Sequence, residues 1–90
     1  MRQYKQLFDK FLRKYICNYR KKKNLSQEDM AEILCETPRS YIDQEHGKYG
    51  FSGLTVMFFM LELPEEEILL FISQFREDLH KEENRHGDVS

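Results

Sequence analysis

Apolar residues recur every three or four positions through the first quarter of the chain, and charged residues fill most positions between them. This period is that of an α-helix with one buried face. The apolar positions are Tyr4, Leu7, Phe8, Phe11, Leu12, Tyr15, Ile16 and Tyr19. The pattern predicts a long helix from about residue 3 to residue 22. Asn24 follows the basic run 20–23 and suits the end of this helix.

The next segment, about residues 26–47, carries start and stop signals for two short helices. Ser26 can cap the first, and the acid three residues later is a weaker form of the capping-box residue. Thr37 can cap the second, and Pro38 follows at the first helical position, where its missing N–H costs nothing. Gly47 suits the end of this second helix. Two helices joined by such a tight turn form the helix-turn-helix layout.

Two further helices are predicted after this segment. Residues from Gly53 to about Leu61 are apolar almost all round, which is typical of a helix packed on several sides at the centre of a bundle. Pro64 then breaks the chain, and a last helix is expected over about residues 65–83 with acids in its first turn. Its apolar stripe is Ile68, Ile72, Phe75 and Leu79. The polar tail 84–90 is expected to fray.

Five helices with short connections and no strand pattern predict an all-α bundle. The 90 residues are enough for one modest core, and no linker, repeat or low-complexity tract divides them. We therefore expect a single domain over residues 1–90.

The net charge of −2 conceals a strong asymmetry along the chain. Residues 1–25 carry nine Lys or Arg against one acid, whereas residues 26–90 carry five Lys or Arg against fifteen acids. A basic third on an acidic remainder favours a protein that attracts a polyanion on one side. The other interpretation is that these charges form an ordinary solvated helix surface.

The sequence contains no recognisable pattern of catalytic or metal-ligating residues. Cys17 and Cys35 have neither a second cysteine nor a histidine at metal-ligand spacing, and they are expected to be free thiols. No nucleophile–base set, phosphate loop or paired acids are recognisable, so we expect no enzyme activity, no metal and no cofactor. No apolar run resembles a secretory signal or approaches the length of a membrane span, which predicts a cytoplasmic protein without a membrane partner.

Positions on either side of the turn match a known pattern without a gap. They are Ile16, Tyr19, Arg20, Leu25, Ser26, Gln27, Ala31, Leu34, Thr37, Tyr41, Glu45, Gly47 and Lys48. Over about residues 12–63 the chain resembles the phage-repressor (Cro-like, xenobiotic-response-element type) helix-turn-helix family. The resemblance implies a five-helix bundle of the lambda-repressor-like type. It also implies sequence-specific binding of double-stranded DNA by a bacterial or phage-encoded transcriptional regulator, most simply a repressor, that is nucleoid-associated when bound.

The resemblance also assigns roles to individual residues. The helix at 38–46 would lie in the major groove, where its first residues reach base edges. The base-contact candidates are Pro38, Arg39, Ser40, Ile42 and Asp43. Arg39 is the strongest, because its guanidinium matches guanine O6 and N7. The phosphate-contact candidates are Gln27, His46 and Lys48, together with Lys22 and Lys23 from the basic run.

Three positions depart from the family pattern. Cys35 stands where the turn usually has glycine, and Glu36 and Gln44 stand where apolar residues are usual. The helix-turn-helix segment is also acidic. These features support a second hypothesis, a protein-interaction module on the same fold, such as an antitoxin or the partner of another regulator, with weak or no DNA binding.

A homodimer is expected for the DNA-binding hypothesis, because one short helix reads too few base pairs to select a site in a genome. The stripe of the last helix extends beyond what a core of this size needs. We therefore predict a dimer contact through Ile72, Phe75 and Leu79. The alternative is that this stripe packs on the first helix of the same chain and closes the monomer.

Overall fold

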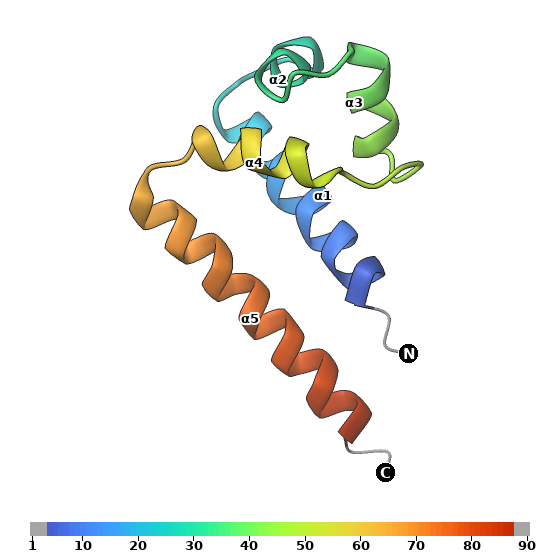
Figure 1. The fold of residues 1–90 in the computed structure, drawn as a ribbon, viewed down its shortest axis with the longest axis vertical. Coiled ribbons are helices and arrows are strands. Elements are labelled where there is room, and N and C mark those ends of the chain that lie inside the picture. Colours follow the sequence, from blue (N-terminus) through green and yellow to red (C-terminus); the bar gives the residue numbers. More distant parts are fainter. Residues whose placement is uncertain (1–3, 88–90) are drawn as a thin grey trace.

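The computed structural model describes residues 4–87, and these residues form five α-helices with no strand (Figure 1). The helices are α1 (Tyr4–Lys22), α2 (Gln27–Ile33), α3 (Pro38–Glu45), α4 (Gly53–Leu61) and α5 (Glu65–Gly87). The prediction of an all-α fold with five helices is confirmed. The predicted bounds agree closely except at the end of α5, which continues through residues 84–87 where fraying was expected. Residue 3 and the tail residues 88–90 lie outside the described part of the chain.

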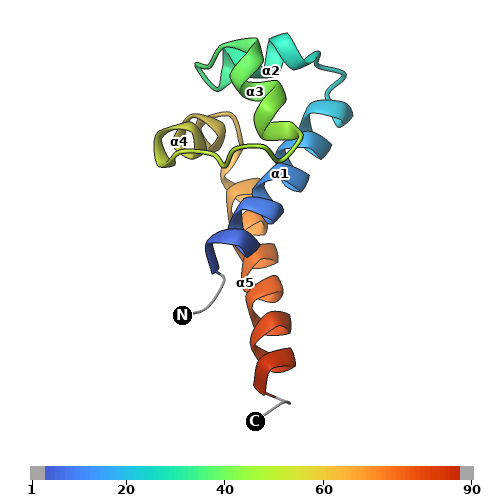
Figure 2. The same ribbon diagram turned by 90° about the vertical axis from the view of Figure 1, so that its right-hand side faces the viewer.

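The helices divide into a two-helix stem and a head. α1 and α5 run in opposite directions, side by side in Figure 1 and crossing obliquely in Figure 2, and α2 and α3 lie together at the far end of α1. α4 crosses between the stem and the head. A hydrogen bond of 3.0 Å from the Tyr4 hydroxyl to Glu83 Oε2 joins the start of α1 to the end of α5.

The core of the head is built around α1. Its Leu12 and Ile16 are fully buried against side chains from each of the next three helices. Those side chains are Met30, Ala31, Leu34, Tyr41 and Phe59. Burial of each large apolar side chain contributes roughly 1.5–3 kcal/mol, so this cluster accounts for much of the association of α1 with the head.

Aromatic rings fill the space between α1 and α5. Phe11 packs against Phe71 and Phe75 with ring centroids 5.1 and 5.2 Å apart, and Phe8 contacts Phe75 at 5.3 Å. Tyr15 meets Phe71 edge-on at 4.8 Å. Edge-to-face and tilted pairs at these distances are favourable for aromatic rings.

This packing changes the interpretation of the apolar positions predicted to line one face of the last helix, Ile68, Ile72, Phe75 and Leu79. Phe71 is the buried centre of the face toward α1, whereas Ile72 is 48% exposed on another face. Phe75 is held by Phe8 and Phe11, as the single-chain alternative expected, and Leu79 is partly buried. Of the three residues predicted for a dimer contact, Ile72 alone is exposed.

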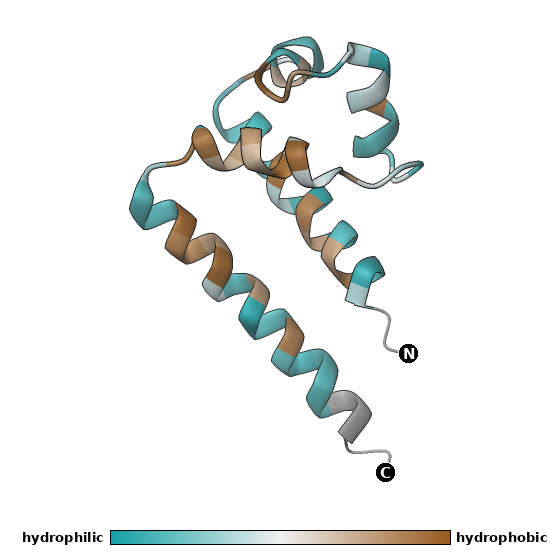
Figure 3. Ribbon diagram, in the orientation of Figure 1, coloured by the Kyte–Doolittle hydropathy of each residue, from teal (hydrophilic) through white to brown (hydrophobic). Residues whose placement is uncertain are grey.

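α4 does not lie at the centre of the bundle, so that prediction was wrong. Phe59 and Thr55 are buried, but Leu54, Met57 and Leu61 are exposed, Leu61 to 74%. Figure 3 shows apolar residues over most of α4 and again in the first half of α5, with a polar segment between the two helices. Despite this, none of the helices in the described part of the chain has both the length and the apolar character to cross a membrane.

The first three helices end in the same way. After each, a residue with positive φ directs its own N–H and that of the next residue back to carbonyls of the last turn, which is the Schellman arrangement. The residues with positive φ are Asn24 (58°), Cys35 (58°) and Gly47 (82°). Asn24 and Gly47 suit this conformation, but Cys35 adopts it with a side chain whose Cβ crowds the backbone.

Replacing Cys35 by glycine should therefore stabilise the protein. We expect Cys35→Gly to raise the free energy of unfolding by about 1 kcal/mol, measured by urea titration, because glycine adopts positive φ without steric cost. Cys35→Ala is the matched control: it removes the thiol, keeps the Cβ and should give no such increase. A Cys35→Gly protein no more stable than Cys35→Ala would contradict this account of the turn.

Candidate nucleic-acid interface

Local hydrogen bonds fix the starts of both helices of the pair. Ser26 Oγ accepts from the Asp29 N–H at 2.9 Å, and Asp29 Oδ2 accepts from the Ser26 N–H at 3.0 Å, so the capping box is complete. Thr37 Oγ1 accepts from the Ser40 N–H at 3.2 Å, and Pro38 occupies the first position of α3. The first turn of α3 therefore has a defined direction.

The Glu45 carboxylate joins α3 to α1 and α2. Arg20 donates to both of its oxygens, from Nε at 2.8 Å and from Nη2 at 3.1 Å. The Tyr41 hydroxyl donates at 2.6 Å and Gln27 Nε2 at 2.7 Å. The Glu45 side chain is only 9% exposed. We call Arg20, Gln27, Tyr41 and Glu45 the Glu45 cluster.

The cluster shifts the protonation of its members. Burial opposes ionisation of Glu45, but the hydrogen bonds from Arg20, Tyr41 and Gln27 outweigh it and lower the pKa of Glu45 to about 2. The hydrogen bond to Glu45 raises the pKa of the Arg20 guanidinium, and burial, together with bonding to Glu45, raises the pKa of the Tyr41 phenol. At neutral pH the cluster is therefore an ion pair with a neutral tyrosine.

Glu36 and Gln44, the two polar residues at positions where apolar ones were expected from the sequence, are hydrogen-bonded to each other. Gln44 Nε2 donates to Glu36 Oε2 at 2.7 Å, and the Thr55 hydroxyl from α4 donates to the same oxygen at 3.4 Å. Burial raises the pKa of Glu36, although these hydrogen bonds oppose the rise. Glu36 Oε1 and Gln44 Oε1 are buried without a hydrogen-bond partner among the described residues. The polar pair thus links the turn, α3 and α4 in place of an apolar contact.

The base-contact candidates lie within the first six residues of α3. Pro38, Arg39 and Ser40 are exposed, and Ile42 and Asp43 are partly buried. The Arg39 side chain is 84% exposed, with its Nε 3.7 Å from Asp43 Oδ2. A contact of this length to so exposed a guanidinium contributes little, so Arg39 can leave it for another partner.

The phosphate-contact candidates do not form one group. His46 and Lys48 are exposed at the end of α3, with the Lys48 ammonium 5.6 Å from the Tyr49 ring centroid. Lys23 is also exposed, and its ammonium lies 5.6 Å from the Tyr19 ring centroid. The Gln27 amide nitrogen is used by Glu45, which makes it a poor phosphate donor.

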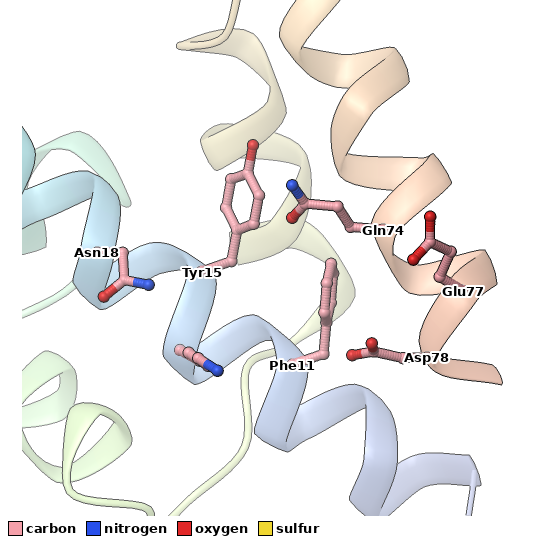
Figure 4. Close-up of a pocket in the computed structure, with 7 residues that line it drawn as sticks. Phe11, Tyr15, Asn18, Gln74, Glu77 and Asp78 are labelled. Atoms are coloured by element: carbon pink, nitrogen blue, oxygen red, sulfur yellow. The ribbon is translucent and has the colours of Figure 1, made fainter. Parts of the chain in front are cut away.

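Lys22 lies on a different side of α1, in a groove shared with α5. Tyr15, Asn18 and Glu67 line the same part of this groove. The neighbouring part, shown in Figure 4, brings Phe11 and Tyr15 of α1 opposite polar side chains of α5. These α5 side chains are Gln74, Glu77 and Asp78. Lys22 is therefore directed toward α5, and it is the weakest of the phosphate candidates.

Two contacts of α1 with the α3–α4 connection were not anticipated from the sequence. The guanidinium of Arg13 lies against Gly47, where a Cβ would come within 3.1 Å of Nη1. The carboxylate of Asp9 lies against Gly50, where a Cβ would come within 2.8 Å of Oδ2. A cation at the C-terminal end of α3 is favourable for the helix dipole. The only sequence signal for these contacts is the pair of glycines, which permits close approach.

Comparison of the chain with protein-family models, curated proteins and solved structures gave no match. Assignment of a function therefore depends on the residues and contacts described above.

The Glu45 cluster predicts a specific pH dependence of stability. The folded pKa of about 2 lies below the ordinary value of 4.5, so the contribution of Glu45 is complete above pH 4.5 and declines as the pH falls toward 2. A shift of this size corresponds to about 3 kcal/mol. Glu45→Gln should be less stable than the wild type at pH 6, and urea titrations should show this difference shrinking between pH 5 and pH 3.

Glu28→Gln is the matched control for this experiment. Glu28 is exposed on α2, so its replacement should leave the pH dependence close to that of the wild type. A difference between wild type and Glu45→Gln that stays constant down to pH 3 would show that Glu45 is not held as an ion in the folded protein.

Proposed function

We propose that this protein binds double-stranded DNA sequence-specifically and regulates transcription, with α3 entering the major groove. The observation that carries the proposal is the Glu45 cluster. It anchors the C-terminal end of α3 to α1 and α2, while the first three residues of α3, Pro38 to Ser40, are exposed. A short helix supported in this way at the surface suits the docking mode of helix-turn-helix proteins, in which the first residues of the second helix reach base edges.

The exposed residues of α3 suggest a division of roles. Arg39 can donate two hydrogen bonds to guanine, and Asp43 either orients Arg39 or accepts from cytosine N4. Ile42 can contact a thymine methyl group, Ser40 can bond to several base edges, and Pro38 contributes shape. Lys48, His46 and Lys23 are available for backbone phosphates.

The acidic composition of the motif opposes DNA binding less than the sequence suggests. Glu45 is neutralised by Arg20, and Glu36 is partly buried with Gln44 and Thr55 as partners. The Asp29 carboxylate is bound in its capping box. Three of the six acids in residues 26–47 are therefore engaged in internal hydrogen bonds.

The second candidate is a protein-interaction module on the same fold, an antitoxin or a partner of another regulator. Glu28 and Glu32 favour it, because both are exposed on α2 and have no basic partner among residues 4–84. These two carboxylates would repel a phosphate backbone that passed close to α2.

Selection of duplexes from a random DNA pool separates the two candidates. DNA binding predicts enrichment of one short motif, whereas the interaction module predicts no enrichment above the input pool.

The role of Arg39 can then be measured at the selected site. Arg39→Ala should lose about 1–3 kcal/mol of binding free energy and relax the preference at one base pair, because a bidentate contact to guanine is removed. Lys14→Ala is the matched control: Lys14 is exposed in the groove between α1 and α5, so its loss should leave the sequence preference unchanged. An Arg39→Ala protein with wild-type affinity and wild-type preference would exclude Arg39 from base readout.

A further inference from the structure

One face of α5 is exposed and has no partner in the described part of the molecule. Glu65, Leu69, Ile72 and Arg76 follow one another at intervals of four, three and four residues, so they lie on one side of the helix. All four are exposed, Leu69 to 66% and Ile72 to 48%. The face toward α1 is instead formed by Phe71 and Phe75. We call the four exposed residues the α5 stripe.

The α5 stripe has a symmetric order. Its two apolar residues lie at the centre, an acid lies at one end and a base lies at the other. If two copies of α5 pack antiparallel about a two-fold axis between positions 70 and 71, Leu69 of each copy lies opposite Ile72 of the other. The same register places Glu65 of each copy opposite Arg76 of the other. The stripe is therefore complementary to itself, because apolar residues face apolar residues and each acid faces a base.

From this complementarity we infer that the α5 stripe binds a second copy of this chain in an antiparallel α5–α5 contact. Neither Glu65 nor Arg76 forms an ion pair among residues 4–84, so both are available for a partner. An isologous contact uses the same patch twice, which requires a self-complementary charge order. Binding to an unrelated partner helix would not require this self-complementary order.

The surroundings of the stripe support a protein contact. The exposed aliphatic side chains of the described chain are confined to two consecutive helices, α4 and the first half of α5. They are Leu54, Met57 and Leu61 on α4, with Leu69, Leu70 and Ile72 on α5. Concentration of exposed apolar surface on one part of a small protein is typical of an interaction site.

The contact leaves the proposed DNA-reading surface free. α3 lies at the head of the molecule, whereas the α5 stripe lies along the stem, and Figure 1 shows the two helices on opposite sides of α4. Dimer formation requires no DNA. A failure of the dimer and a failure of DNA binding can therefore be distinguished.

Charge reversal at the two ends of the stripe tests the contact. Glu65→Arg alone and Arg76→Glu alone each place like charges opposite each other at both ends of the contact. Each should weaken dimerisation about tenfold in sedimentation equilibrium. The double variant Glu65→Arg/Arg76→Glu restores opposite charges in the same register and should recover the wild-type dissociation constant. Glu77→Arg, on the side of α5 that lines the groove with α1, is the matched control and should not change dimerisation.

A second variant tests the apolar centre. Ile72→Glu should give a monomer whose thermal melt remains cooperative, because the side chain is exposed in the monomer. A monomeric wild-type protein would overturn the inference. Failure of the double charge variant to recover dimerisation would overturn the register, and an unfolded Ile72→Glu protein would place the stripe in the monomer core.

Discussion

The arrangement of α2 and α3 on α1 depends on one buried ion pair. Glu45 and Arg20 lie 25 positions apart in the chain, and their contact fixes the distance and orientation between α1 and α3. Removing two charges from water is costly unless each remaining donor and acceptor finds a partner. Here Tyr41 and Gln27 supply the further donors, so the carboxylate is satisfied. Because it satisfies directional bonds from three helices, the pair specifies one arrangement in a way that apolar packing alone would not.

A second set of polar contacts, between Glu36, Gln44 and Thr55, joins the turn to α4. Glu36 and Gln44 would each disrupt an apolar contact if they occurred alone, but together with Thr55 they form a hydrogen-bonded bridge from the turn to α4. Two oxygens of the bridge remain without a partner among the described residues, and burial of unpaired acceptors reduces stability. The unpaired acceptors of the bridge and the positive φ of Cys35 therefore both reduce stability at the turn.

Local signals in the sequence were sufficient to predict where the helices begin and end, but not which face of each helix is buried. Ser26, Thr37 and Gly47 act through hydrogen bonds or backbone angles within a few residues, and the bounds predicted from them agree closely with the structure. α4 is apolar all round, so periodicity could not indicate which face would be buried. The partners of Arg20 and Glu36 lie on other helices and have no local signature. In α5, Phe71 and Ile72 are both apolar, and only the aromatic contacts with α1 determine which of them is buried.

We propose that the first residues of α3, a helix whose other end is held by the Glu45 cluster, form the surface that contacts DNA. Titration of ¹⁵N-labelled protein with a random-sequence duplex at low salt tests it directly, because backbone amides report contact residue by residue. The account predicts the largest chemical-shift changes in residues 37–43 and 46–48, with the amides of 69–76 unaffected. Changes confined to α4 and α5, or none at duplex concentrations that saturate nonspecific binding, would contradict it.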